Sequence, residues 1–134
     1  MSQTQGAQLV RDFDNDKDLE LINTWLKARS QRALNKSELP KVGMIFENVL
    51  AGFLYQTDSD MCFIENFVSN PKAKRKSVSS AIDFMTAHFV IKAKELGKPK
   101  VFVFTKKRSI LNRAKELGFN VSASNYNFAS MEVK

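Results

Sequence analysis

The spacing of apolar and polar residues along the first third of the chain predicts a strand and a helix. Residues 8–13 have the pattern of a short strand, and residues 14–16, all Asp or Asn, are candidate caps for the helix that follows. That helix is predicted to run to about Arg29, with one apolar face made of Leu19, Ile22, Trp25 and Leu26. A second, short helical piece is expected over residues 32–36, before the break at Pro40.

The middle of the chain has the pattern of an antiparallel meander. Residues 42–47 and 49–56 are predicted strands joined at Glu47-Asn48, a plausible tight hairpin. The polar turn 57–60 then leads to a further strand over residues 61–68. Three consecutive antiparallel strands are therefore expected.

The second half predicts a long helix, a buried strand, a shorter helix and a last strand. The helix is expected over residues 77–96, ending at Gly97, with an apolar stripe of Val78, Ala81, Ile82, Met85 and Phe89. Residues 100–105 form a short apolar run that is typical of a strand buried on both faces, and therefore parallel to its neighbour. Ser109 is the expected cap of a helix over residues 110–117 that ends at Gly118, and a final strand is expected over residues 126–133.

These elements predict one α/β (α+β) domain over residues 1–134. The 134 residues, 43% of them hydrophobic, are enough for one core and too few for two ordinary domains. The expected sheet is mixed and mostly antiparallel, flanked by helices, with the order β-α-(α)-β-β-β-α-β-α-β. A right-handed crossover is expected after the fourth strand.

Composition narrows the function classes. The single cysteine, Cys62, excludes an internal disulfide, and with one histidine, His88, no familiar zinc constellation is available, so we expect no metal. Cys62 is expected to be a small buried residue and His88 a structural or solvated one. No apolar run approaches the roughly 20 residues that span a bilayer, and the amino-terminal residues lack the pattern of a signal peptide. A cytoplasmic location without membrane association is expected.

Positive charge is concentrated in the second half of the chain. Residues 1–71 hold 7 basic and 10 acidic side chains, whereas residues 72–134 hold 14 and 4. Four of these cations, Lys72, Lys74, Arg75 and Lys76, lie between a predicted strand and the start of the long helix, where free backbone N–H groups and the helix dipole favour an anion. Charge alone leaves nucleic acid, a membrane surface, a phosphorylated cofactor or merely a solvated turn open.

The order of elements and three short motifs resemble the GCN5-related N-acetyltransferase (GNAT) superfamily over nearly the whole chain. The motifs are LPKVG at residues 39–43, FVSNP at residues 67–71 and KELGF at residues 115–119. More narrowly, the chain is similar to compact GNAT-like proteins that tailed bacteriophages encode, some of which are virion components. The resemblance implies acetyl-CoA as co-substrate.

In GNAT proteins a loop of the form Gln/Arg-x-x-Gly-x-Gly/Ala binds the pyrophosphate of acetyl-CoA through its backbone amides. On this chain the motif falls on Lys74, Arg75, Lys76, Ser77, Val78 and Ser79. Both glycines are serine here, so the resemblance implies weakened rather than abolished binding, because a side chain stands where phosphate approaches the backbone. The alternative is a helix start capped by Ser77 that holds no ligand.

Glu65 is the candidate general base for the amine. A carboxylate in an otherwise apolar strand is a better proton acceptor near neutral pH than one in water. Strict alternation places Glu65 with Phe63 and Phe67 on one side of the strand, and the other side then holds Ile64, Asn66 and Val68. A solvent-facing Glu65 is the competing interpretation. By resemblance, the backbone of Phe67 and Val68 pairs with the pantetheine arm and polarises the thioester.

The last predicted helix lacks two residues that many GNAT proteins have. Ala114 stands at the position of the tyrosine that protonates the departing thiolate, and Lys107 at that of an asparagine that contacts the cofactor. Tyr55 and Tyr126 are the candidates to replace that acid, and the sequence does not select between them.

Two functions from different classes follow. The first is an acyl-CoA-dependent N-acyltransferase that moves an acetyl group to an unidentified amine. The second is a non-catalytic GNAT-like accessory or virion protein whose basic surface binds a partner, with self-association also open. Nucleic acid is not expected as the partner, because the basic loop lacks the interleaved aromatic residues that stack on bases.

Overall fold

The computed structural model describes residues 10–103, 108–121 and 131. The chain divides into two compact units, Met1–Phe104 and Thr105–Lys134, and each is described by itself. The predicted last strand, residues 126–133, lies outside the described residues apart from the exposed Met131. The prediction of one domain over the whole chain therefore stays a prediction.

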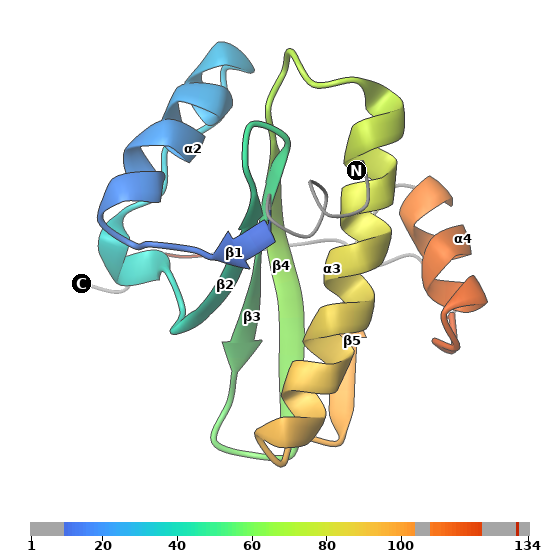
Figure 1. Ribbon diagram of the computed structural model, residues 1–134. Coiled ribbons are helices and arrows are strands. Elements are labelled where there is room, and N and C mark those ends of the chain that lie inside the picture. Colours follow the sequence, from blue (N-terminus) through green and yellow to red (C-terminus); the bar gives the residue numbers. More distant parts are fainter. Residues whose placement is uncertain (1–9, 104–107, 122–130, 132–134) are drawn as a thin grey trace. The chain divides into compact units, whose positions relative to one another are not determined.

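The first unit is built on a five-stranded sheet in the order β1-β2-β3-β4-β5 (Figure 1). Successive strands pair antiparallel from β1 to β4, and β5 pairs parallel with β4. This arrangement confirms the predicted mixed, mostly antiparallel sheet. The strands are Val10–Asp12 (β1), Val42–Phe46 (β2), Leu50–Gln56 (β3), Met61–Ser69 (β4) and Lys100–Val103 (β5).

Helix α2 (Lys17–Ala28) has Asp16 as its N-cap residue, but the side chain of Asp16 makes no capping hydrogen bond, and Asp14 binds the first N–H groups instead. Asp14 Oδ1 accepts hydrogen bonds from the backbone N–H groups of Asp16 (2.8 Å) and Lys17 (3.0 Å). Asp18, which is buried, then accepts two hydrogen bonds from Arg11 of β1 at 2.7 and 2.8 Å, so helix and sheet edge are joined at this end.

The second helical piece is shorter and later than predicted. It is a 3₁₀ turn, η1 (Lys36–Glu38), and residues 32–35 are not helical. The reason is local: the Glu38 carboxylate accepts a hydrogen bond from the Asn35 N–H at 2.7 Å and forms an ion pair with Arg32 at 2.8 Å. Both contacts stabilise a helical start at residue 36.

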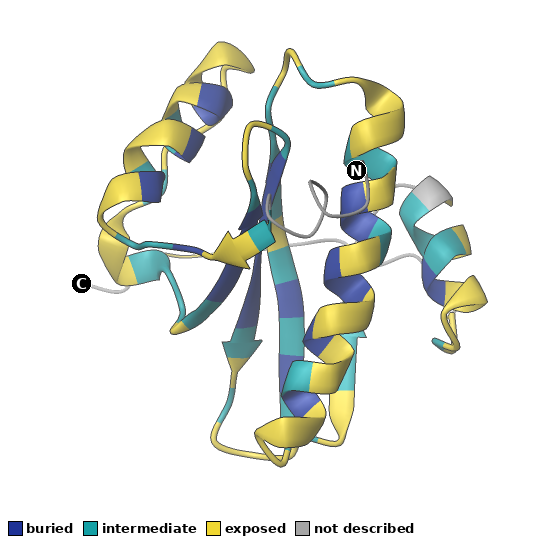
Figure 2. Cartoon of the chain, viewed as in Figure 1, coloured by how far each residue is buried: buried dark blue, intermediate teal, exposed yellow. Residues whose placement is uncertain are grey.

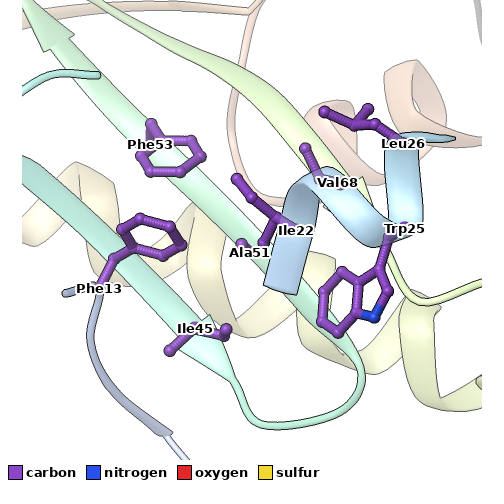
Figure 3. Packing of buried hydrophobic residues seen from close by; sticks show 8 residues of the cluster. All are labelled: Phe13, Ile22, Trp25, Leu26, Ile45, Ala51, Phe53 and Val68. Atoms are coloured by element: carbon purple, nitrogen blue, oxygen red, sulfur yellow. The ribbon is translucent and has the colours of Figure 1, made fainter. Parts of the chain in front are cut away.

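The face of the sheet toward α2 holds one apolar cluster (Figure 3). It consists of Phe13, Ile22, Trp25, Leu26, Ile45, Ala51, Phe53 and Val68. Gly43 of β2 makes room for it, because a Cβ there would lie 2.7 Å from the Phe53 ring. The glycine of the LPKVG motif is therefore required by the packing of Phe53 against Phe13, whose rings lie 4.8 Å apart.

Helix α3 (Arg75–Glu95) packs on the opposite face, with its buried stripe toward the sheet (Figure 2). The stripe contains the predicted Ala81, Ile82, Met85 and Phe89, together with Thr86 and Ala93, and Val78 is half-buried. The helix begins two residues earlier than predicted and ends at Glu95, and Gly97, whose φ of 74° suits glycine, follows its C-cap Leu96. It provides the predicted crossover from β4 to the parallel β5.

Strand β5 is less buried than the sequence predicts: Val101, Phe102 and Val103 are half-buried and Lys100 is exposed. Among the described residues, β5 is an edge strand with β4 as its one neighbour, which explains the exposure. In the second unit, helix α4 (Arg108–Glu116) begins ahead of the predicted residue 110. Gly118, with a φ of 101°, follows it as predicted.

Candidate active site

Strand β4 carries a bulge in its second half. Phe53 of β3 pairs with Glu65, and Ala51 pairs with Val68, so two steps along β3 correspond to three along β4. Within the extra length lies Asn66, whose φ of 58° is in the left-handed region. Such an extra residue bends the strand and interrupts the regular hydrogen bonding to its neighbour.

Gly52 lies opposite the bulge and makes it possible. A Cβ at Gly52 would lie 2.8 Å from two carbon atoms of the Phe67 ring and 3.1 Å from the Met85 sulfur. The ring of Phe67 thus crosses β3 at the one position that has no side chain. An asparagine inside a strand and a glycine in the facing strand are the sequence signals that could have indicated this bulge.

Because of the bulge, the side chains of β4 are distributed over the two faces of the sheet differently from the prediction. Directly paired residues lie on the same face of a sheet, so Glu65 and Val68 both lie on the α2 side, opposite Phe53 and Ala51. Phe67 instead lies on the α3 side, against Gly52 and Met85. The prediction that Phe63, Glu65 and Phe67 share one side, with Val68 on the other, is therefore wrong for Phe67 and for Val68, because the extra residue shifts the alternation.

Only the first half of β4 pairs with β5. The parallel register runs from Met61 opposite Lys100 to Ile64 opposite Val103. Among the described residues, the half of β4 from Glu65 to Ser69 has a strand partner on the β3 side alone. The backbone of Phe67 and Val68, the residues predicted to contact the pantetheine arm, belongs to this half.

The loop from β4 to α3 is held by Asn70. Its side-chain oxygen accepts a hydrogen bond from the Lys72 N–H and its carbonyl oxygen accepts one from Ala73, both at 3.0 Å. Its amide also donates to the carbonyl of Asn48 at 2.9 Å, which ties the loop to the β2–β3 hairpin. The chain therefore enters α3 from a fixed turn.

The start of α3 has no compensating negative group of its own. Its N-cap is Lys74, no side chain caps it, and its first turn contains no acidic residue. The first helical hydrogen bond joins the Val78 N–H to the Lys74 carbonyl at 3.0 Å, so the N–H groups of residues 75–77 precede the helical ladder. Lys74, Arg75 and Lys76 are all exposed around them.

The two serines at the motif's glycine positions lie inside this helix. Ser77 is exposed and occupies the third helical position, and Ser79 is half-buried in the next turn. The alternative in which Ser77 caps the helix is wrong, because the helix begins two residues before it. Val78 between them is half-buried.

A second polar side chain, Tyr55, lies near Glu65. The sequence left open whether Tyr55 or Tyr126 replaces the missing acid. Glu65 is half-buried on the α2 side, and Tyr55 of β3 is its neighbour on that face. Burial raises the pKa of the Tyr55 phenol, a hydrogen bond from Asn66 opposes this, and the Glu65 carboxylate adds to the rise. Tyr126, the other candidate acid, lies outside the described residues.

The other residues that the sequence analysis considered lie in different parts of the chain. Ala114 is buried in the second unit, while Lys107 lies outside the described residues. Cys62 is fully buried, and burial raises the pKa of its thiol. His88 is exposed and stacks on Phe84 with the ring centres 5.9 Å apart.

In the described parts of the chain, no helix is long and apolar enough to cross a membrane.

Several solved structures with the same architecture are described as acetyltransferases, and one is described as a transcriptional regulator. A putative acetyltransferase from Agrobacterium tumefaciens has a TM-score of 0.63 at 15% identity, covering 90% of this chain and 99% of its own. A predicted acetyltransferase from Clostridium acetobutylicum, solved with acetyl-CoA, has a TM-score of 0.58 at 16% identity over 90% and 94%. The Mycobacterium tuberculosis protein Rv2747, solved with CoA, has a TM-score of 0.62 at 18% identity over 79% and 69%.

At these identities the comparison establishes the fold, which is that of the GNAT-like acetyltransferases. No protein-family model and no curated protein matches the sequence. The particular reaction and substrate therefore rest on this chain's own residues.

Proposed function

We propose that the chain is an acyl-CoA-dependent N-acyltransferase that moves an acetyl group from acetyl-CoA to an amine. The observation that carries the proposal is the sequence of features at the end of β4. In the described part of the chain, a bulged half-strand with a strand partner on one side alone leads through a fixed turn into a helix start that has no side-chain cap, no acid and three exposed cations. Such a helix start stabilises phosphate, and an unpaired strand edge can hydrogen-bond an extended arm.

The proposed chemistry uses few groups. The neutral amine attacks the thioester carbonyl carbon, a carbon–nitrogen bond forms, and the backbone N–H of Phe67 stabilises the oxyanion. Glu65 accepts the excess proton of the amine. The carbon–sulfur bond then breaks, and the CoA thiolate leaves and takes a proton from solvent. Tyr55 does not supply that proton in this scheme, because its hydroxyl proton is already donated to a carbonyl.

A non-catalytic GNAT-like protein, for example a phage accessory or virion component, is the second candidate. It is favoured by side chains at the motif positions: Ser77 and Ser79 in place of both glycines, and Ala114 in place of the tyrosine acid. In that case the cations of residues 74–76 contact a partner instead of pyrophosphate.

Binding of acetyl-CoA separates the two candidates. Acetyl-CoA at about 100 times its dissociation constant stabilises a protein by roughly 2.7 kcal/mol, which thermal denaturation detects. We expect this shift in the wild type and not in the triple variant Lys74→Ala, Arg75→Ala, Lys76→Ala. A control that removes three exposed cations elsewhere, Lys27→Ala, Arg29→Ala, Lys41→Ala, should keep it. No shift in the wild type, or an equal shift in both triple variants, contradicts the site.

Turnover then tests the role of Glu65. With acetyl-CoA and a panel of amines, Glu65→Gln should leave acetyl-CoA affinity nearly unchanged and slow thiol release by about 100-fold or more, as the loss of a general base does. Full activity in Glu65→Gln would show that another group or water accepts the proton.

A further inference from the structure

The bulge in β4 depends on a residue in an unusual backbone conformation. Asn66 has a φ of 58°, which few residues other than glycine adopt, although asparagine does so more readily than most. A conformation of this kind persists where the surrounding structure holds it, and such positions cluster at functional sites. The contacts of the Asn66 side chain show what holds this residue in the left-handed conformation.

Those contacts lead to one hydroxyl group. The Asn66 amide donates a hydrogen bond to the Tyr55 oxygen at 2.7 Å, and the Tyr55 hydroxyl donates to the Glu38 carbonyl at 3.1 Å. The Glu38 side chain is itself fixed by Arg32 and by the Asn35 N–H. One phenol thus joins the bulge of β4, the middle strand β3 and the turn η1 that precedes β2.

This arrangement fixes the backbone that follows the bulge. Tyr55 is half-buried and has only two side-chain torsions, so its oxygen has a defined position. With its backbone in the left-handed conformation, Asn66 places its side-chain amide in hydrogen-bond contact with that oxygen. Phe67 and Val68 come next along β4. Rotation of the peptide planes around Asn66 would therefore require breaking the bond to Tyr55.

From this we infer that Tyr55 and Asn66 form a positioning pair that aims the backbone N–H of Phe67 at the thioester carbonyl. The inference rests on the proposed function. It also assigns Tyr55 a role other than the acid that the sequence suggested: both its donor and its acceptor capacity are used within the protein. Neither residue needs to touch the reacting atoms.

Comparing acetyl-CoA with CoA tests this role, because CoA lacks the thioester carbonyl and shares everything else. By calorimetry on the full chain, Tyr55→Phe should weaken acetyl-CoA binding by about 5-fold, the order of one lost neutral hydrogen bond. Its affinity for CoA should stay unchanged. Asn66→Gly, which keeps the left-handed conformation without strain, should give the same result.

The double variant and a control complete the test. Because the two residues act through one hydrogen bond, Tyr55→Phe with Asn66→Gly should weaken acetyl-CoA binding no more than either alone. Thr57→Val removes a 2.7 Å hydrogen bond at the far end of β3 and should change neither affinity.

Each remaining outcome overturns a specific statement. Equal weakening of acetyl-CoA and CoA binding, or no weakening of either, in Tyr55→Phe overturns the positioning role while the proposed function stands. Absence of binding of both molecules to the wild type overturns the proposed function, and the positioning role with it.

Discussion

Replacing Gly52 by alanine tests whether the bulge in β4 depends on the empty space opposite it. The new Cβ would lie 2.8 Å from the Cδ1 and Cε1 atoms of Phe67, closer than carbon atoms pack, and 3.1 Å from the Met85 sulfur. The φ of Gly52 is not in the left-handed region, so alanine would not strain the backbone there and the expected effect is steric. The ring must tilt or the two strands must separate.

The magnitude follows from two opposing effects. Overpacking of a core position costs about 1 to 3 kcal/mol. Loss of glycine's conformational freedom in the unfolded chain returns up to about 1 kcal/mol. A net loss of about 1 to 2 kcal/mol is expected, which lowers Tm by roughly 4 to 8 °C for a chain of this size.

Two further variants make this prediction specific. Phe67→Ala with Gly52→Ala should be less destabilised than the sum of the single variants, because trimming the ring removes the clash. Gly43→Ala meets a similar obstacle, a Phe53 atom at 2.7 Å, but on the α2 side of the sheet. It should lose comparable stability and retain acetyl-CoA binding, whereas Gly52→Ala should lose that binding.

Equilibrium unfolding in urea measures the stabilities, and calorimetry at a temperature where every variant is folded measures the binding. An unchanged or higher stability of Gly52→Ala would refute the steric reasoning. Strict additivity of Gly52→Ala and Phe67→Ala would show that the ring is not the obstacle.

Two more predictions concern the start of α3 and the start of α2. Ser77→Gly with Ser79→Gly should tighten CoA binding while lowering the apo Tm, since glycine in a helix costs up to about 1 kcal/mol per site; weaker binding by calorimetry would make the serine hydroxyls ligands themselves. Asp18→Asn should cost about 1 to 3 kcal/mol at pH 7, because the Arg11 hydrogen bonds hold the pKa of Asp18 below its ordinary 3.8. The contribution of ionised Asp18 to the free energy of unfolding is complete above the unfolded-state pKa of 3.8, and it is lost as pH falls through the lower pKa of Asp18 in the folded protein. In urea unfolding, the free energy of unfolding of Asp18→Asn should therefore fall less steeply in acid than that of the wild type.

Much of the first unit could be predicted because its pattern is local. The helical spacing of Ile22, Trp25 and Leu26 identifies the buried face of α2, and all three are buried. The meander from β2 to β4 and the parallel β5 follow from short turns and from a helix-length connection. The start of α3 was missed by two residues, because its N-cap is a lysine and the turn before it is set by Asn70.

The candidate site was predicted in part, and the missing part is non-local. The sequence of β4 satisfies simple alternation, so nothing within it requires a bulge. The bulge is decided by Gly52 on another strand and by Tyr55, which bonds Asn66. Pattern analysis of one segment cannot report a constraint that a second segment imposes.

The half of β4 from Glu65 to Ser69, which among the described residues has a strand partner on one side alone, also bears on how the protein avoids aggregation. A strand edge with free N–H and C=O groups can recruit a strand from another molecule, and a flat, regular edge does so most readily. Here the left-handed residue Asn66 interrupts the regular spacing of those groups and bends the strand. An intruding strand would find matching partners for only a residue or two. Where the described residues leave β4 with one strand partner, the bulge therefore makes its other edge poorly suited to extending the sheet into a neighbouring chain.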